Sequence, residues 1–248
     1  MVSEDALMNE IDITHDFYEY YEKNIDPDKY SKVLRKWHKI LWEKYLPDNK
    51  NILNLVEKDY GLFHKSNLGE YYLTSDSIIH TYSRRKSFSD IVNKFPIEEI
   101  NNFRHIASKI GGYILFPGYK INNAQTINGA RGFNVKIADR FDLTLECIRL
   151  YYLGENDKLI NPLGDVLNRY DNYFKLFLDF KGYCNFFLLQ DLTYDNFTKI
   201  KYFLPFTGFT SKPLPSSVDE YGIYKNNCID FVNSRNNRII EYIRGNTK

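Results

Sequence analysis

Residues 51–75, with the sequence NILNLVEKDYGLFHKSNLGEYYLTS, contain short apolar runs separated by Asn, Gly and Ser. Runs of this length between turn-forming residues are typical of β-strands, so the segment predicts two or three strands. The segments on either side carry apolar residues at three- and four-residue steps, which indicates helices. Strands that are grouped within a mainly helical chain predict an α+β fold, a helix-rich single domain with a small antiparallel sheet.

The predicted helices have recognisable ends. Residues 26–47 begin with Asp26 as a candidate N-cap and Pro27 at the first helical position, and Pro47 ends the run. The apolar face of this helix is predicted to comprise Tyr30, Val33, Trp37, Ile40, Leu41 and Tyr45. Further helices are predicted within residues 76–110, over 133–154 and over about 217–244, and the segment 113–118 is predicted to be a strand.

Composition excludes several classes of protein. Lys and Arg number 33 against 32 Asp and Glu, so the net charge of +1 gives no global attraction to nucleic acid or to an anionic membrane. The acidic N-terminus lacks the features of a signal peptide, and no apolar stretch reaches the roughly 20 residues that span a bilayer. The three cysteines, Cys147, Cys184 and Cys228, are widely spaced and indicate reduced thiols. We therefore expect a cytoplasmic protein that forms one domain over residues 1–248.

The aromatic content of 17%, with 21 Tyr and 18 Phe, is high. Codon bias in an AT-rich genome and an aromatic core explain it most simply. The alternative is a surface on which nucleic-acid bases stack.

The segment 119–132, rich in Asn and Gly, predicts a loop that leads into the helix over 133–154. Glycines let the backbone approach a ligand closely, and the first N–H groups of a helix are free to bind an anion. The planar guanidinium of an arginine can donate two hydrogen bonds to a phosphate or a carboxylate. This junction is the candidate binding site for a nucleotide or another phosphate-bearing ligand. Its residues are Asn128, Gly129, Arg131 and Gly132, with Arg140 as a second cation. The alternative is an ordinary turn in which the arginine pairs with a neighbouring acid.

Three carboxylates follow at helical spacing and define a candidate metal site. Asp139, Asp142 and Glu146 would share one helix face with Arg149 and could hold Mg²⁺ through oxygen ligands. Such a site would suit a metal-dependent hydrolase of phosphodiesters or nucleotides. The alternative is that the acids favour the helix start and that Glu146 and Arg149 form a routine surface pair.

Two weaker features lie in the first half of the chain. His64 could meet Asp76 or His80 in space, although no histidine has metal-ligand spacing to another. The run from Ser83 to Lys86 is a local basic patch, and such a run is usually a solvated face.

Three stretches carry a resemblance to a known family. They are DPDKYSKVLRKWHKILWEKYLP, TINGARG followed by IADRFDLTLECIR, and RYDNYFKLFLDFKGYCNFFLLQDL with the closing SRNNRI. The chain resembles an uncharacterised family of bacterial and phage-encoded proteins, a domain of unknown function. The resemblance implies a complete family member and carries no assigned reaction and no catalytic residues.

A role in phage–host conflict is the context that this family suggests. A third hypothesis is therefore a protein-interaction module, such as an inhibitor of a host or phage complex, with exposed aromatic residues at its interface. If the chain forms homo-oligomers, we expect the interface at residues 170–190 or at the C-terminal helix.

Overall fold

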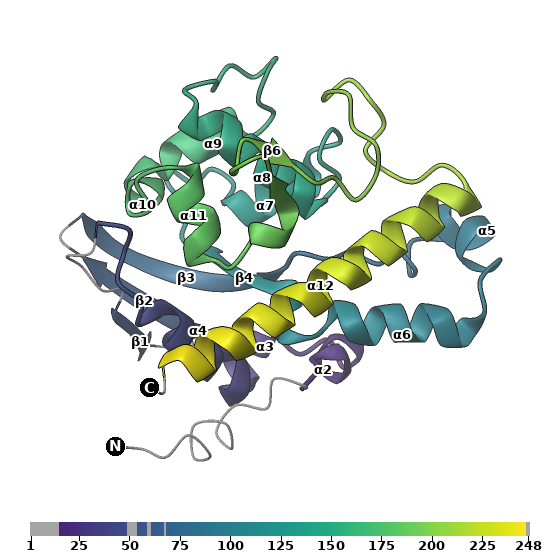
Figure 1. The fold of residues 1–248 in the computed structure, drawn as a ribbon, viewed down its shortest axis with the longest axis horizontal. Coiled ribbons are helices and arrows are strands. Elements are labelled where there is room, and N and C mark those ends of the chain that lie inside the picture. Colours follow the sequence, from purple (N-terminus) through teal and green to yellow (C-terminus); the bar gives the residue numbers. More distant parts are fainter. Residues whose placement is uncertain (1–14, 49–53, 59–60, 67, 247–248) are drawn as a thin grey trace.

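The computed structural model describes residues 15–48, 54–58, 61–66 and 68–246. It has helices on both sides of an antiparallel sheet with strand order β1-β2-β3-β4 (Figure 1). The strands span Asn54–Lys58 (β1), Gly61–Ser66 (β2), Gly69–Ser77 (β3) and Tyr113–Pro117 (β4), and a two-stranded sheet pairs Thr193–Tyr194 (β5) with Lys199–Ile200 (β6). The predicted α+β class, with a small antiparallel sheet, is confirmed.

Helices make up most of the remaining ordered structure. The α-helices are Tyr18–Glu22 (α2), Pro27–Tyr30 (α3), Lys32–Trp42 (α4), Ser89–Val92 (α5), Ile97–Ala107 (α6), Ile127–Phe133 (α7), Phe141–Tyr152 (α8), Gly164–Arg169 (α9), Asp171–Lys175 (α10), Phe180–Phe186 (α11) and Val218–Asn246 (α12). The 3-10 helices are Lys86–Phe88 (η1), Ile110–Gly112 (η2) and Gln190–Leu192 (η3).

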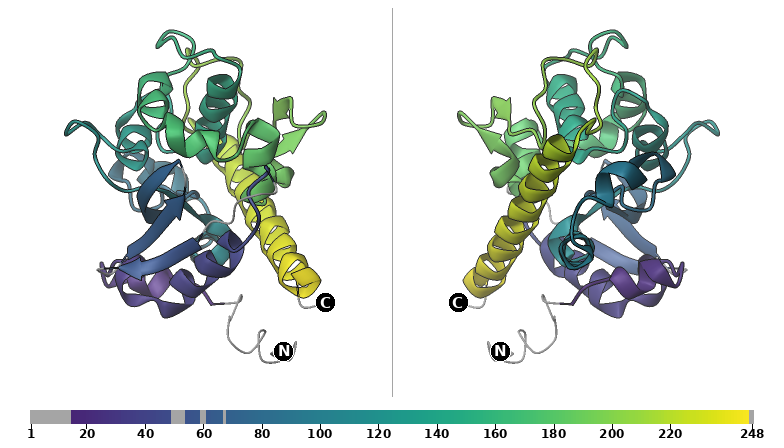
Figure 2. Two further views of the ribbon diagram at one scale, coloured as in Figure 1. Left: turned by 90° about the vertical axis from the view of Figure 1, so that its left-hand side faces the viewer. Right: turned by 90° about the vertical axis from the view of Figure 1, so that its right-hand side faces the viewer.

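The helices form two groups that α12 connects. In Figure 1, α7 to α11 lie above β3 and β4, and α2, α4 and α6 lie below them. The helix α12 crosses the molecule diagonally from α5 to the region of α4, and Figure 2 shows the same course from both sides. None of the helices in the described part of the chain is long and apolar enough to cross a membrane.

The helix expected over residues 26–47 is interrupted at Ser31. The N–H of Ser31 donates to the Pro27 carbonyl (2.8 Å) and ends α3, and its Oγ accepts from the Leu34 N–H (3.2 Å) and begins α4. Because Ser31 is extended, the apolar stripe does not continue through it, and Tyr30 and Tyr45 are exposed. The apolar residues on the buried face of α4 are Leu34, Trp37, Leu41 and Trp42, and Arg35 and His38 are buried beside them.

Two further predicted stretches differ from the structure. Residues 78–85 are not helical and connect β3 to η1, and the helix expected over 133–154 begins at Phe141. Part of the expected loop is helix α7 instead. Between α7 and α8, Ala138 and Asp139 have φ of 49° and 67°, so the backbone turns in a left-handed conformation and cannot continue a helix.

Aromatic side chains form much of the core. Rings of α10, α11 and the turn between them pack edge to face or tilted, with Tyr183 and Phe187 at 4.7 Å between centroids and Phe177 and Tyr183 at 5.3 Å. Trp42 of α4 joins them at 4.9 Å from Phe187. This packing uses residues 170–190 within the fold and accounts for part of the high aromatic content.

Candidate functional site

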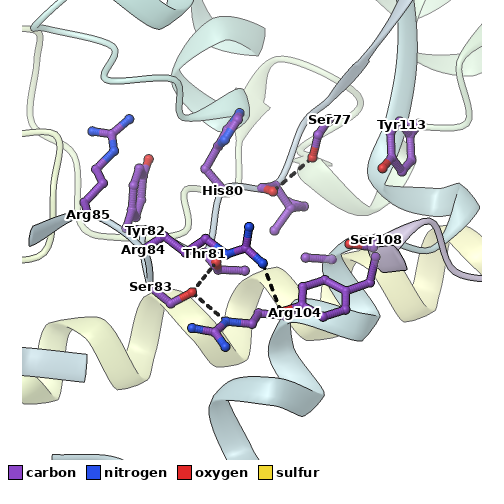
Figure 3. A pocket seen from close by; sticks show the side chains of 13 residues that line it. Ser77, His80, Thr81, Tyr82, Ser83, Arg84, Arg85, Arg104, Ser108 and Tyr113 are labelled. Carbon is purple, nitrogen blue, oxygen red and sulfur yellow. Dashed lines mark hydrogen bonds between the residues drawn. The ribbon is translucent and has the colours of Figure 1, made fainter. Parts of the chain in front are cut away.

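A basic pocket lies where the 77–85 segment passes the end of α6. It has a volume of about 210 Å³. Figure 3 shows the side chains around it. The lining residues are Tyr18, Ser77, Ile79, His80, Thr81, Tyr82, Ser83, Arg84, Arg85, Arg104, Ala107, Ser108 and Tyr113. None of these residues is acidic.

Tyrosines hold the backbone of the 77–85 segment in place. From α12, the hydroxyl of Tyr221 donates to the Thr81 carbonyl (2.7 Å), and that of Tyr224 donates to the His80 carbonyl (2.9 Å). Tyr82 has φ of 53° and its hydroxyl donates to the Ala138 carbonyl (2.9 Å). These long-range bonds fix a connection that has no regular secondary structure of its own, and they set the directions of its side chains.

Three arginines supply the positive charge of the pocket. Arg104 donates to Ser83 Oγ (2.9 Å), and Arg84 donates to the Tyr18 hydroxyl and to Glu22 of α2 (each 3.3 Å). The Arg85 guanidinium lies 4.8 Å from the ring centroid of Tyr82 and has no carboxylate partner in the described part of the chain. Arg85 is therefore the cation that is best placed to meet a ligand.

Behind the pocket, a buried arginine joins two acids. Arg131 of α7 is fully buried and forms a salt bridge with Asp76 at the end of β3. Its Nη1 lies 3.4 Å from Asp139 Oδ1, and its Nη2 donates to the Asp139 carbonyl (3.1 Å). Its Nε donates to Thr144 Oγ1 (3.3 Å). The second carboxylate oxygen of Asp139 lies 2.9 Å from His80 Nε2, which connects the buried network to the pocket wall.

The charges in this network act on one another. Burial raises the pKa of Asp76 above its usual value, although the Arg131 charge acts against the shift. Burial also opposes ionisation of Asp139, but the contact with His80 and the Arg131 charge outweigh it and lower the pKa of Asp139. Arg131 is desolvated too, and the two acids overcome this and raise its pKa. Asp139 is thus held as a carboxylate beside the His80 imidazole.

The sequence-predicted residues of α7 lie beside this network. The Gly129 N–H donates to Thr126 Oγ1 (3.2 Å), so it serves the N-cap of α7. The side-chain oxygen of Asn128 is buried without a hydrogen-bond partner among the described residues, and Gly132 lies close to the Asp139 carboxylate. The guanidinium of Arg131 points inward and is occupied by protein groups.

Arg140 belongs to a separate buried network. It forms a salt bridge with Asp142 and donates to the Pro213 carbonyl (2.7 Å), and Asp142 accepts from the Phe203 N–H (2.8 Å). The structure therefore does not bring Arg140 and Arg131 into one pocket. The Arg140–Asp142 pair attaches the segment 203–213 to the start of α8.

The three candidate metal ligands have separate arginine partners. Asp139 precedes α8 and pairs with Arg131, and Asp142 pairs with Arg140. Glu146 accepts two bonds from Arg149 (each 2.8 Å). The three carboxylates do not share one helix face, and the described ranges contain no group of three His, Cys, Asp or Glu side chains that could hold a metal ion.

The sequence did not predict that arginines of the 83–86 run, Arg104 and His80 line one pocket. The basic run 83–86 was a visible signal, but the helix expected over 76–110 concealed its geometry. His64 was predicted to meet Asp76 or His80. In the structure, His80 and Asp76 instead act on each other electrostatically in the Arg131 network. His64 lies instead on β2, stacked on Tyr71 at 5.3 Å.

Fold and site together define an α+β protein with a basic pocket in front of a buried Asp–Arg–Asp network. The chain belongs to a family of unknown function, DUF6994, whose model matches residues 11–239. The expected membership of a family of unknown function is confirmed. The bacterial and phage association stays a prediction. No curated protein and no solved structure matches the chain.

Proposed function

We propose that the protein binds a phosphate-bearing ligand, such as a nucleotide, in the pocket beside the 77–85 segment. The observation that carries this proposal is the lining of the pocket, in which three arginines and a histidine occur without an acidic residue. Arginine presents a planar fork of donors that matches phosphate oxygens, and its charge strengthens each hydrogen bond. Hydroxyl groups of Ser77, Thr81, Ser83 and Ser108 add further polar groups around the same space.

The size of the pocket restricts what enters it. Pockets for drug-sized ligands have volumes of roughly 300–1,000 Å³, and this one has about 210 Å³. A phosphoryl group with part of an attached sugar suits such a volume. Tyr18, Tyr82 and Tyr113 also line the pocket, and each of these rings is buried within the fold.

The test is a binding measurement on the full chain with a matched pair of charge variants. Inorganic phosphate, AMP, ADP and ATP are titrated by calorimetry, and thermal shifts are recorded in parallel. Arg85→Gln is expected to weaken binding about 10- to 100-fold, because a hydrogen bond to a charged group contributes roughly 1.5–3 kcal/mol.

Lys86→Gln is the control for this experiment. Lys86 is exposed, adjoins Arg85 in the chain and does not line the pocket, so its loss changes the net charge equally without removing a ligand contact. We expect binding by Lys86→Gln to stay within about twofold of the unmodified protein. Failure of all four anions to bind, or equal weakening in both variants, would overturn the proposal.

A further inference from the structure

We infer that the pocket is also catalytic, and that His80 is the general base for hydrolysis of a phosphate ester held by Arg85. This inference rests on the proposed function, because it requires the phosphate to bind in the same pocket. It assigns a reaction to a site for which binding alone is proposed above.

The two ring nitrogens of His80 have different environments. Nε2 lies 2.9 Å from Asp139 Oδ2, an ion-pair contact whose angle does not make a hydrogen bond. His80 lines the pocket, and its Nδ1 makes no hydrogen bond within residues 15–48, 54–58, 61–66 and 68–246. The negative charge beside Nε2 favours the tautomer that carries its proton there, which leaves Nδ1 as an acceptor. Nδ1 is thus available to take a proton from a water molecule in the pocket.

The Asp139 carboxylate is itself held in place. Arg131, which is fully buried, holds both the carboxylate and the main-chain carbonyl of Asp139. The Arg131–Asp76 salt bridge fixes the guanidinium in turn. Asp139 therefore acts as a positioning residue: it sets the orientation of the imidazole and stabilises the cation that forms when His80 accepts a proton.

Arg85, which has no carboxylate partner among the described residues, lies near this pair. His80, Tyr82 and Arg85 extend to the same side of the 80–85 segment in Figure 3. The positive charge of Arg85 also acts on Asp139 and contributes to its lowered pKa, so the two groups are electrostatic neighbours. A phosphate bound by Arg85 would lie near the base that activates the attacking water.

The step is a single displacement at phosphorus. The water oxygen forms a bond to phosphorus while one of its protons passes to Nδ1 of His80. The bond from phosphorus to the ester oxygen breaks, and its electron pair leaves with that oxygen, which takes a proton from solvent. The imidazolium then returns its proton to solvent. One ester and one water molecule give one alcohol and one phosphate group, and Arg85 stabilises the charge on the phosphoryl oxygens.

The experiment uses bis(p-nitrophenyl) phosphate and p-nitrophenyl phosphate as probes, with release of p-nitrophenolate as the readout. We expect the full chain to hydrolyse at least one of them. His80→Ala should lower kcat at least 100-fold, the scale of general-base catalysis, while retaining binding of inorganic phosphate. Added imidazole should restore part of the activity of His80→Ala, which a structural role would not permit.

Two further variants complete the test. His80→Gln is a second substitution of the base, and near-UV circular dichroism checks that both His80 variants are folded. The Tyr224 bond to the main chain at residue 80 is independent of the side chain. Asp139→Asn should lower kcat more than it raises KM. Lys86→Gln, outside the pocket, should hydrolyse the probes at the unmodified rate.

The possible failures are distinguishable. If the unmodified protein binds inorganic phosphate or a nucleotide but hydrolyses neither probe, the catalytic inference is overturned and the binding proposal stands. Activity in folded His80→Ala or His80→Gln equal to that of the unmodified protein would also overturn it. If neither inorganic phosphate nor a nucleotide binds, the proposed function is overturned, and the catalytic inference that rests on it is overturned too.

Discussion

At the scale of single residues, Arg131 determines how the site is built. It is fully buried, and each of its donors is directed at Asp76, Asp139, Thr144 or a main-chain carbonyl. An arginine with this set of partners supports the fold and orients Asp139. In the proposed function, the exposed Arg85 contacts the ligand instead.

We expect Arg131→Gln to lower the free energy of unfolding by about 3–5 kcal/mol, because two partly buried carboxylates lose their shared cation. Urea unfolding at pH 7 measures the change. The comparison is Lys158→Gln, which removes a cation from the exposed salt bridge with Asp165 and should leave the unfolding midpoint unaltered. Equal midpoints for Arg131→Gln and the unmodified chain would show that Asp76 and Asp139 do not depend on this arginine.

The sequence singled out Arg131 but not its partners. Asp76 precedes it by 55 residues, and the two meet because β3 pairs with β4 and α7 packs against β4. Asp139 was expected on a helix face, where it would have pointed with Asp142 and Glu146. The left-handed turn at Ala138 and Asp139 redirects it toward His80, and this turn depends on contacts that spacing does not encode.

At the scale of elements, α12 approaches η2 closely at Gly111. A Cβ added at Gly111 would lie 2.8 Å from the Val232 carbonyl oxygen and 2.7 Å from Asn236 Oδ1. The Gly111 N–H also donates to Asn236 Oδ1 (2.8 Å). A side chain at residue 111 would therefore separate α12 from the start of β4, where Arg235 donates to the Gly111 and Tyr113 carbonyls.

We expect Gly111→Ala to destabilise the protein by about 1–3 kcal/mol through overpacking. The control is Gly222→Ala on α12, where the added Cβ would lie 3.7 Å from the Phe95 ring in ordinary contact. That substitution should stabilise by up to about 1 kcal/mol, since alanine favours helix over glycine. Thermal unfolding shows whether each variant is less or more stable than the unmodified protein. A Gly111→Ala variant as stable as the unmodified protein would contradict the packing argument.

Elements with a clear local pattern of apolar residues were predictable. The strands predicted within residues 51–75 are present among the described residues, and the strand predicted over 113–118 is β4. The 77–85 segment was not predictable, because hydroxyls of Tyr221 and Tyr224, about 140 residues away, hold its backbone. The pocket depends on that segment, so it was not predictable either.

At the scale of the whole molecule, the core contains basic groups that are held neutral. His38 and His64 are buried, and the ring nitrogens of both lack hydrogen-bond partners among the residues that the structure describes. Burial lowers the pKa of His64 to about 4, and burial with the nearby Arg235 charge lowers the pKa of His38 to about 3. Both histidines are therefore neutral in the folded protein over a range of pH in which the unfolded chain is protonated.

This difference makes stability depend on pH with a definite sign. Below about pH 6.5 the unfolded chain takes up protons at both histidines and the folded protein does not, so stability is lost as the pH falls from about 6.5 toward 4. At pH 5 the loss is about 2 kcal/mol for each histidine, from 1.36 kcal/mol per pH unit. Asp28 and Asp76, whose pKa values burial raises, act in the opposite direction.

A substitution at His64 isolates one histidine from these opposing groups. His64→Phe keeps an aromatic ring on Tyr71 and removes the titrating nitrogens. We expect the fall in unfolding free energy between pH 7 and pH 5 to be about 2 kcal/mol smaller in His64→Phe than in the unmodified protein. Urea unfolding of both proteins at the two pH values measures this difference. The contributions of Asp28 and Asp76 cancel in the comparison because both proteins contain these residues. An identical fall in both proteins would mean that His64 is protonated to the same extent in the folded and unfolded states.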